Sequence, residues 1–169
     1  MAIIFDLDQT LIESHSAKLH RRDRNWDVVY SMIPKLLPYE GIPELLQELS
    51  AKSIPFGIVT SSPASYCNRI VKHWGWKVHF TVCYHDTQRR KPHPDPINLG
   101  VTKLGVPKES VVSIGDDPKD ILAARSAGVT SVGVLWGAKD PQGLIKTSPD
   151  YLFNTTEEMV NFLKRRYNF

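Results

Sequence analysis

The chain has 169 residues, of which 41% are hydrophobic and 23% are charged, an ordinary composition for a globular domain. Its formal net charge of +3 favours anionic partners but is too small to indicate nucleic-acid binding by itself. No apolar run approaches the roughly 20 residues that cross a bilayer, so no membrane partner is expected. Two cysteines give neither a disulfide framework nor zinc-ligand spacing, and the N-terminus lacks the pattern of a signal peptide, so we expect a cytoplasmic protein.

The first predicted element is a short buried strand that ends in two aspartates, Asp6 and Asp8. An apolar run of this length is typical of a parallel strand that is covered on both faces. Side chains two residues apart on an extended chain point the same way, so both carboxylates project from the carboxyl end of the strand, where α/β sheets bind ligands. Such a pair needs a cation, a shared proton or a lysine beside it, unless it merely opens a helix.

The following segment, residues 13–40, interrupts this pattern. It is basic between Lys18 and Arg24, and then apolar at helical spacings up to Pro38. We interpret it as a small helical insertion that is too short to be an independent domain, within a single domain of residues 1–169. The basic cluster is either a solvated helix face or a rim that attracts a phosphorylated substrate.

The rest of the chain alternates predicted strands with predicted helices. Strands are expected at residues 54–59, 79–84, 111–114, 130–135 and 151–153. Helices are expected at 42–52, 63–73, 97–104 and 120–127, and after Thr155 or Thr156. This alternation is typical of βαβ units, so the predicted fold class is α/β, a parallel Rossmann-like sheet with helices on both faces.

Polar side chains gather where the predicted strands end, at one edge of the predicted sheet. They are Asp6, Asp8, Thr10, Thr60, Ser61, Asp116, Asp117 and Asp120, joined by Lys91 from a proline-rich loop. Each has a simpler alternative. Thr60 and Ser61 would cap the helix that Pro63 begins, Lys91 would be a surface lysine, and the later aspartates would be helix N-caps.

Taken together, these motifs resemble those of the haloacid dehalogenase (HAD) superfamily. They are Asp-Leu-Asp-Gln-Thr, a threonine after the second strand, Lys-Pro after a loop, and Gly-Asp-Asp-x-x-Asp after the fourth strand. The resemblance covers nearly the whole chain in order, and is nearest to the phosphoglycolate-phosphatase-like subgroup with a minimal cap. It implies a Rossmann-like HAD fold, Mg²⁺ as cofactor, and hydrolysis of a phosphate monoester.

The resemblance also implies a role for each site residue. Asp6 would be the nucleophile that forms an aspartyl-phosphate, and Asp8 the general acid and base. Thr60 and Ser61 would bind the phosphoryl group, and Lys91 would neutralise its charge. The metal ligands would be Asp6, the backbone carbonyl of Asp8, and Asp116, with Thr10, Asp117 and Asp120 in supporting positions. Of the last two, Asp120 ranks above Asp117 as a neighbour of the metal.

Two features refine the expected chemistry. The dehalogenases of the superfamily lack an acidic residue at the position of Asp8, so this residue favours phosphoryl transfer over cleavage of a carbon–halogen bond. Gln9 stands where the family often has glycine, which adopts left-handed backbone angles easily, so this turn is where a departure from the family is expected.

The short insertion bears on the choice of substrate, because a minimal cap leaves the site open. We expect a phosphorylated small metabolite, contacted by Trp26 and the basic cluster. A polynucleotide end or a phosphoprotein is the alternative, although the chain has no basic stripe interleaved with aromatic residues. A non-catalytic binding module is a third interpretation, disfavoured because every expected catalytic residue is present.

Overall fold

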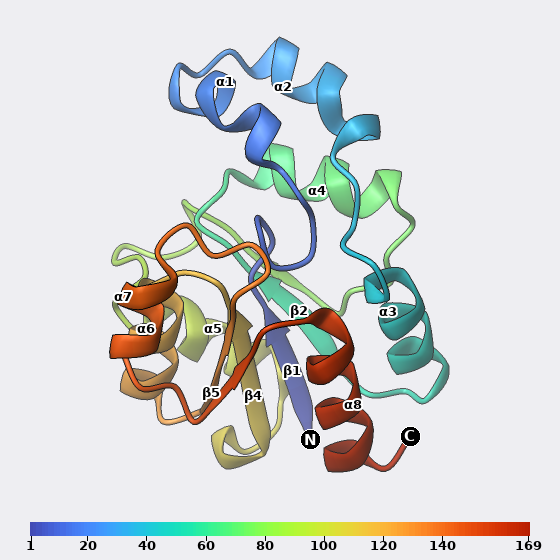
Figure 1. Ribbon diagram of the computed structural model, residues 1–169, viewed down its shortest axis with the longest axis vertical. Coiled ribbons are helices and arrows are strands. Elements are labelled where there is room, and N and C mark those ends of the chain that lie inside the picture. Colours follow the sequence, from blue (N-terminus) through green and yellow to red (C-terminus); the bar gives the residue numbers. More distant parts are fainter.

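The structure is a computed structural model that describes residues 1–169. At its centre lies a six-stranded parallel sheet in the order β3-β2-β1-β4-β5-β6 (Figure 1). The strands are β1 (Ala2–Phe5), β2 (Phe56–Val59), β3 (Thr81–Val82), β4 (Val111–Gly115), β5 (Thr130–Val134) and β6 (Tyr151–Phe153). The predicted α/β fold class is therefore confirmed.

The helices alternate with these strands along the chain. They are α1 (Lys18–Arg22), α2 (Trp26–Met32), α3 (Ile42–Ala51), α4 (Ala64–His73), α5 (Asp95–Leu104), α6 (Pro118–Ala127), α7 (Pro141–Lys146) and α8 (Thr156–Tyr167). Short 3-10 helices lie at His15–Ala17, Ile33–Lys35 and Lys108–Ser110. None of the helices combines the length and the apolar character needed to cross a bilayer.

The alternation of side chains along β1 divides the core into two layers. Ile3 and Phe5 pack on one face of the sheet with α3, α4 and α8, whereas Ala2 and Ile4 pack on the other with α5 and α6. Figure 1 shows α3 and α8 on one side of the sheet and α5 and α6 on the other. Both faces are covered, which explains why β1, β2 and β4 are fully buried and, apart from Ser113, apolar.

The second and third predicted strands are shorter than expected, and one helix was not predicted. The third strand is only Thr81–Val82, although the Tyr84 N–H beyond it still donates to the Ser62 carbonyl at 3.0 Å. The second strand begins at Phe56 rather than at residue 54. Helix α7 was not predicted; Asp140 caps it by accepting the Gly143 N–H at 2.9 Å.

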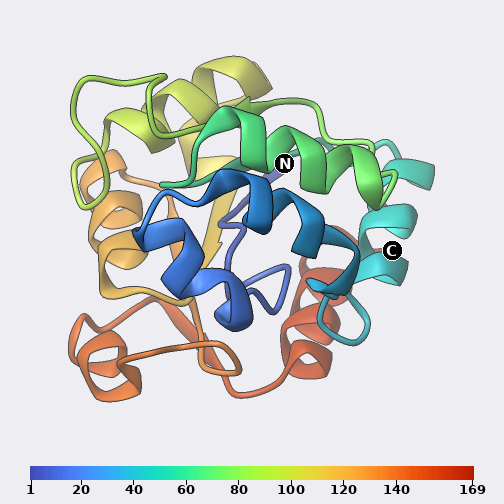
Figure 2. The same ribbon diagram turned by 90° about the horizontal axis from the view of Figure 1, so that it is seen from above.

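Residues 13–40 contain α1 and α2, which lie across the carboxyl ends of the strands, beside α4 (Figures 1 and 2). Val29 is completely buried and anchors α2 in the main hydrophobic cluster. The Tyr30 hydroxyl donates a hydrogen bond to Ser65 Oγ at 2.9 Å, and the Trp26 ring lies 6.4 Å from the ring of Tyr66. The insertion is therefore docked on α4.

The two chain segments that connect the insertion to the core run side by side. The Glu13 N–H donates to the Leu37 carbonyl at 2.9 Å, and the Tyr39 N–H donates to the Leu11 carbonyl at 3.0 Å. These bonds flank an isolated antiparallel bridge. The insertion thus leaves and re-enters the core at one point, above the end of β1.

Candidate active site

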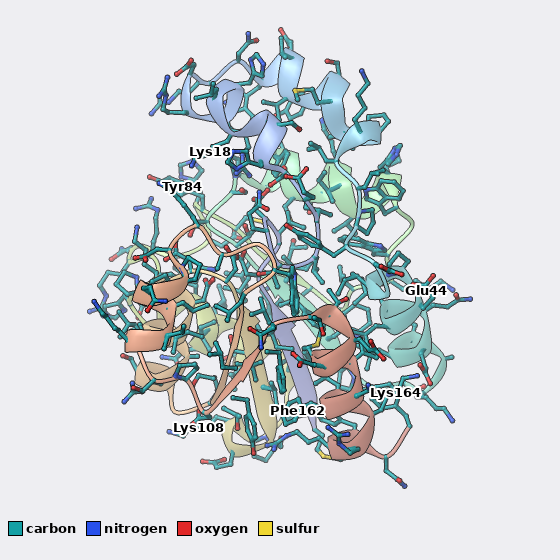
Figure 3. The ribbon with its side chains drawn as sticks, viewed as in Figure 1. Lys18, Glu44, Tyr84, Lys108, Phe162 and Lys164 are labelled. Atoms are coloured by element: carbon teal, nitrogen blue, oxygen red, sulfur yellow. The ribbon has the colours of Figure 1, made fainter.

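A cavity of about 1070 Å³ lies at the carboxyl end of the sheet, between the core and the insertion. Lys18 on the insertion and Tyr84 on the core, both labelled in Figure 3, contribute to its walls. Of the residues predicted for the site, those that line the cavity are Asp6, Asp8, Thr60, Ser61, Lys91, Asp116, Asp117 and Asp120. Thr10 lies behind this lining and is buried.

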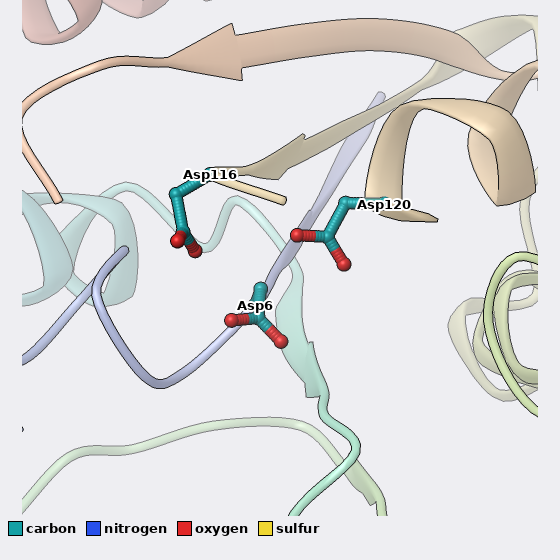
Figure 4. A group of neighbouring side chains, drawn as sticks. All are labelled: Asp6, Asp116 and Asp120. Atoms are coloured by element: carbon teal, nitrogen blue, oxygen red, sulfur yellow. The ribbon is translucent and has the colours of Figure 1, made fainter. Parts of the chain in front are cut away.

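Three carboxylates form a compact cluster at the base of the cavity (Figure 4). Asp6 follows β1, Asp116 follows β4, and Asp120 lies in the first turn of α6. Each offers an oxygen atom, and these atoms lie within 4.8 Å of one another. The Thr10 hydroxyl donates to Asp116 Oδ1 at 2.9 Å, so this predicted supporting residue orients one member of the cluster.

Lys91 is the one cation in direct contact with this cluster. Its Nζ donates hydrogen bonds to Asp6 Oδ1 at 2.7 Å, to Asp120 Oδ1 at 2.5 Å and to the Val59 carbonyl at 3.0 Å. Only 5% of its side chain is exposed, so the alternative of a surface lysine is wrong. Burial by itself would lower the pKa of Lys91, but the charges of Asp120 and Asp6 raise it above its usual range, and the ammonium group is fully charged.

Full ionisation of the three carboxylates would leave an excess of negative charge beside the single charge of Lys91. Burial raises the pKa of Asp6 to about 7, in spite of the opposing charge of Lys91. Burial, followed by the charges of Asp6 and Asp120, raises the pKa of Asp116 to about 9. Asp116 has a hydroxyl group as its hydrogen-bond partner and no ion pair. The arrangement therefore favours an additional cation among the three carboxylates.

Asp8 lies in the opposite electrostatic environment. Its carboxylate forms an ion pair with Arg21 of α1 and accepts hydrogen bonds from Ser62 Oγ at 2.6 Å, Ser14 Oγ at 2.7 Å and Tyr66 Oη at 2.9 Å. Burial acts to raise the pKa of Asp8, but the charge of Arg21 and the hydroxyl groups outweigh it and lower the pKa. Asp6 and Asp8 lie two residues apart, yet the pKa of Asp6 is raised and the pKa of Asp8 is lowered.

Sequence reasoning missed most of the partners of Asp8. It included Arg21 only as part of the basic cluster, and it did not single out Ser14, Ser62 or Tyr66. A signal did exist for two of them. Ser62 lies in the short loop between β2 and α4 and Tyr66 in the first turn of α4, at the edge of the sheet where Asp8 also lies, so their side chains can converge on the same point.

Thr60 and Ser61 follow β2 and face the cavity. The alternative that they cap α4 is wrong, because the N-cap residue of α4 is Pro63 and no side chain caps the helix. Thr60 is buried, and its Oγ1 accepts the Ser62 N–H at 3.1 Å. The hydroxyl proton of Thr60 therefore remains available to an oxygen atom of a ligand.

The capping alternative is correct for Asp117. Its Oδ1 accepts the Lys119 N–H at 2.9 Å, and Asp120 Oδ2 accepts the Asp117 N–H at 3.1 Å, which completes a capping box at the start of α6. Asp120 therefore uses one carboxylate oxygen for the helix and the other for Lys91. Asp120, and not Asp117, belongs to the three-carboxylate cluster, and its rank above Asp117 as a neighbour of a metal stays a prediction.

The turn after β1 retains a glycine-like conformation although it has no glycine. Gln9 has φ of +66°, in the left-handed region that favours glycine. Its side-chain oxygen accepts a hydrogen bond from Tyr39 Oη at 2.7 Å, which stabilises the turn. The departure from the family is therefore in the residue type, whereas the backbone angle stays in the region that glycine prefers.

Comparison with known proteins agrees with this geometry. The sequence model of the family described as "Haloacid dehalogenase-like hydrolase" matches residues 23–134, more than half of the chain. The chain belongs to this HAD family. The predicted recognition is thereby confirmed, and the parallel sheet with its cluster of aspartates is the HAD fold of this chain.

Curated relatives of this HAD chain are named as phosphatases. The N-acetylmuramic acid 6-phosphate phosphatase of Pseudomonas aeruginosa is 31% identical over 131 residues, which cover 76% of this chain and 58% of that protein. The phosphoglycolate phosphatase of Escherichia coli K12 is 29% identical over 124 residues, which cover 72% of this chain and 49% of that protein. The chain thus spans about half the length of these relatives.

Solved structures support the fold at lower sequence identity. A hydrolase from Pseudomonas syringae superimposes with a TM-score of 0.79 at 22% identity, and the match covers 97% of this chain and 98% of that one. At this identity the likeness concerns the fold alone.

Proposed function

We propose that this HAD chain is a Mg²⁺-dependent phosphatase that hydrolyses a phosphate monoester through an aspartyl-phosphate on Asp6. The observation that carries the proposal is the unequal pair of carboxylates after β1. Asp6 contacts Lys91 and faces the acidic cluster, whereas Asp8 is held by Arg21 and three hydroxyl groups. Because the two carboxylates have different environments, one is suited to attack phosphorus and the other to transfer protons.

The first half of the reaction transfers the phosphoryl group to the chain. An Asp6 carboxylate oxygen attacks phosphorus, the bond from phosphorus to the ester oxygen breaks, and that oxygen takes a proton from Asp8. Arg21 favours the ionised form of Asp8 in the free protein, but the negative phosphoryl group that arrives beside Asp8 favours the protonated form. Thr60 and Ser61 donate hydrogen bonds to the phosphoryl oxygens.

The second half releases phosphate. Water attacks phosphorus, Asp8 accepts its proton, and the Asp6 carboxylate leaves as inorganic phosphate is formed. Lys91 holds its positive charge throughout, because two carboxylates keep its pKa high. It therefore neutralises charge at Asp6 and at the phosphoryl oxygens in both halves.

The residues present fit Mg²⁺, which binds carboxylate and carbonyl oxygens. Asp6 and Asp116 would be ligands, and the backbone carbonyl of Asp8, which accepts no hydrogen bond within the chain, would be the third. Asp120 is close enough to contribute to the same site. When bound, Mg²⁺ supplies positive charge that stabilises the transferring phosphoryl group.

We propose a phosphorylated small metabolite as the substrate class. The printed names of two relatives, an N-acetylmuramic acid 6-phosphate phosphatase and a phosphoglycolate phosphatase, support this class. The polynucleotide-end, phosphoprotein and non-catalytic alternatives have no observation of this kind in their favour.

The test is hydrolysis of a generic aryl phosphate in the presence of Mg²⁺ by the parent chain and by Asp6→Asn. We expect the variant to lose activity and to form no phosphorylated chain detectable by mass spectrometry. Asp27→Asn, on the exposed first turn of α2, is the matched control and should keep full activity. Activity that survives the change at Asp6 would refute the assignment of the nucleophile.

A further inference from the structure

The cavity contains positive charge that the proposed phosphatase chemistry does not use. Arg21 is paired with Asp8, and Lys91 with Asp6 and Asp120. Lys18 and Lys139 also line the cavity, and neither has an acidic partner in any ion pair or side-chain hydrogen bond of the structure. These two lysines are the starting point of the inference.

The two ammonium groups come from distant parts of the chain and meet at the rim of the cavity. Lys18 begins α1 in the insertion, and Lys139 lies in the loop between β5 and α7. Both side chains line the same cavity, and the charge of Lys139 lowers the pKa of Lys18. Both side chains are exposed to solvent, and Lys18 lies on the side of the insertion nearest the core (Figure 3).

The backbone on both sides is held in place. Ala17, which precedes Lys18, is completely buried. The loop of Lys139 is fixed by Asp140, which caps α7, and by Gly137, where an added Cβ would lie only 2.0 Å from the Gln9 carbonyl oxygen. Packed elements therefore fix the backbone at both lysines and bring the two side chains to the same cavity.

Two adjacent like charges without a counter-ion are unfavourable, and a bound anion converts their repulsion into attraction. Such an anion would lie in the same cavity as Asp6 and Lys91, but on the wall formed by α1 and the loop of Lys139. A substrate with its phosphoryl group at Asp6 and a negative charge at its far end would fill the phosphoryl site and the position beside the two lysines at the same time.

We propose that Lys18 and Lys139 bind a second anionic group of the substrate, so that the preferred phosphate ester carries a carboxylate or a second phosphate in its leaving group. The placement of the first phosphate at Asp6 rests on the proposed function. The pair of lysines selects among phosphate esters, and it takes no part in breaking the bond.

The first experiment measures binding without turnover. Isothermal titration calorimetry of the Mg²⁺-loaded full chain compares ω-phosphonoalkanoates of increasing spacer length with alkylphosphonates of the same length. We expect the charged compound with the best spacer to bind about five- to tenfold more tightly, as two exposed charge pairs contribute. Raising the ionic strength should reduce this advantage.

The variant that tests the assignment is the double change Lys18→Met with Lys139→Met, which should abolish the advantage and leave the binding of alkylphosphonates unchanged. The matched control is Lys35→Met with Lys103→Met, which removes the same charge at exposed positions outside the cavity lining. A second series with α,ω-bisphosphonates distinguishes a phosphate from a carboxylate as the preferred group.

The outcomes separate the two proposals. Equal binding of charged and neutral compounds by the parent, or an advantage that the double variant retains, would overturn the second anion site. Aryl phosphate hydrolysis that depends on Asp6 tests the phosphatase alone, because its leaving group is uncharged. A chain that hydrolyses no ester but binds charged phosphonates through these lysines would refute the phosphatase and support the anion site.

Discussion

At the scale of single residues, Arg21 is the point where the insertion reaches the proposed chemistry. Its guanidinium group pairs with Asp8 and also donates to Ser62 Oγ at 3.3 Å, so it links α1 to the residues after β1 and β2. Only 20% of its side chain is exposed. The other basic residues of this cluster do not contact Asp8, and their roles differ accordingly.

Changing Arg21→Met is expected to lower kcat for aryl phosphate hydrolysis by about tenfold, because a carboxylate that loses its fixed orientation transfers protons less efficiently. The matched control is Arg22→Met, since Arg22 is 72% exposed and pairs with Asp23 away from Asp8. Steady-state kinetics of both variants make the comparison. An equal loss of kcat in the two variants would mean that the insertion contributes only its net charge to the reaction.

Asp150 gives a residue-scale prediction about stability. Its Oδ2 accepts the Ser131 N–H at 2.8 Å and the Ser131 hydroxyl at 2.7 Å, and these hydrogen bonds lower the pKa of Asp150 in the folded state. A lowered pKa means that the stabilisation is fully present above the unfolded pKa of about 3.9 and is lost as the pH falls through the folded pKa.

Asp150→Asn should therefore lower the free energy of unfolding by about 0.5–1 kcal/mol at pH 7, because Asp150 is exposed and solvent weakens its hydrogen bonds, and by less at pH 3. Urea denaturation at the two pH values measures the difference. Glu40→Gln, at an exposed position, serves as the control and should show little effect at either pH. A loss at pH 3 as large as that at pH 7 would contradict the assignment.

At the scale of elements, apolar runs and helical spacings predicted all six strands and most helices. The proximity of the polar residues after β1, β2 and β4 could be predicted, because the carboxyl ends of parallel strands meet at one edge of the sheet. The pairing of Asp8 with Arg21 could not be predicted. It depends on how the insertion docks over α4, and that orientation is decided by packing of Trp26 and Tyr30 of α2 on α4.

The junction of β4 and α6 supplies the prediction at this scale. A Cβ on Gly115 would lie 2.3 Å from Asp120 Oδ2 and 2.5 Å from its Cβ, and Asp120 is buried in the first turn of α6. Gly115→Ala should therefore displace Asp120 from Lys91, lower the free energy of unfolding by about 1–3 kcal/mol and reduce kcat.

The control for this change is Ser113→Ala in the same strand, which removes an atom from a buried position instead of adding one. Urea midpoints and kcat values of both variants give the comparison. A Gly115→Ala variant with the parent's stability and kcat would mean that the start of α6 shifts freely, contrary to its capping box.

At the scale of the whole molecule, the acidic cluster joins elements from both halves of the chain at a cost in stability. Asp6, Asp116 and Asp120 are brought together by folding, and Lys91 neutralises only part of their charge. A cation that binds the folded chain but not the unfolded chain should therefore raise the melting temperature.

We expect Mg²⁺ at about one hundred times its dissociation constant to raise Tm by about 5–10 °C, from roughly 2.7 kcal/mol of binding free energy. Asp116→Asn should have a higher Tm than the parent without metal, because a buried carboxylate is removed, and should respond weakly to Mg²⁺. Differential scanning calorimetry with and without chelator measures both effects. If the Tm of the parent does not change when Mg²⁺ is added, the proposed metal site is contradicted.

The paired connections at Leu11–Glu13 and Leu37–Tyr39 carry a wider consequence. Because the hydrogen bonds between them close the base of the insertion, a segment of another length can be grafted between these two points without moving the core. The entropy of closing a longer loop is small, about 0.6 kcal/mol for each doubling of its length. The insertion is therefore exchangeable at a single closed base, provided that the new segment supplies Asp8 with partners in place of Arg21 and Ser14.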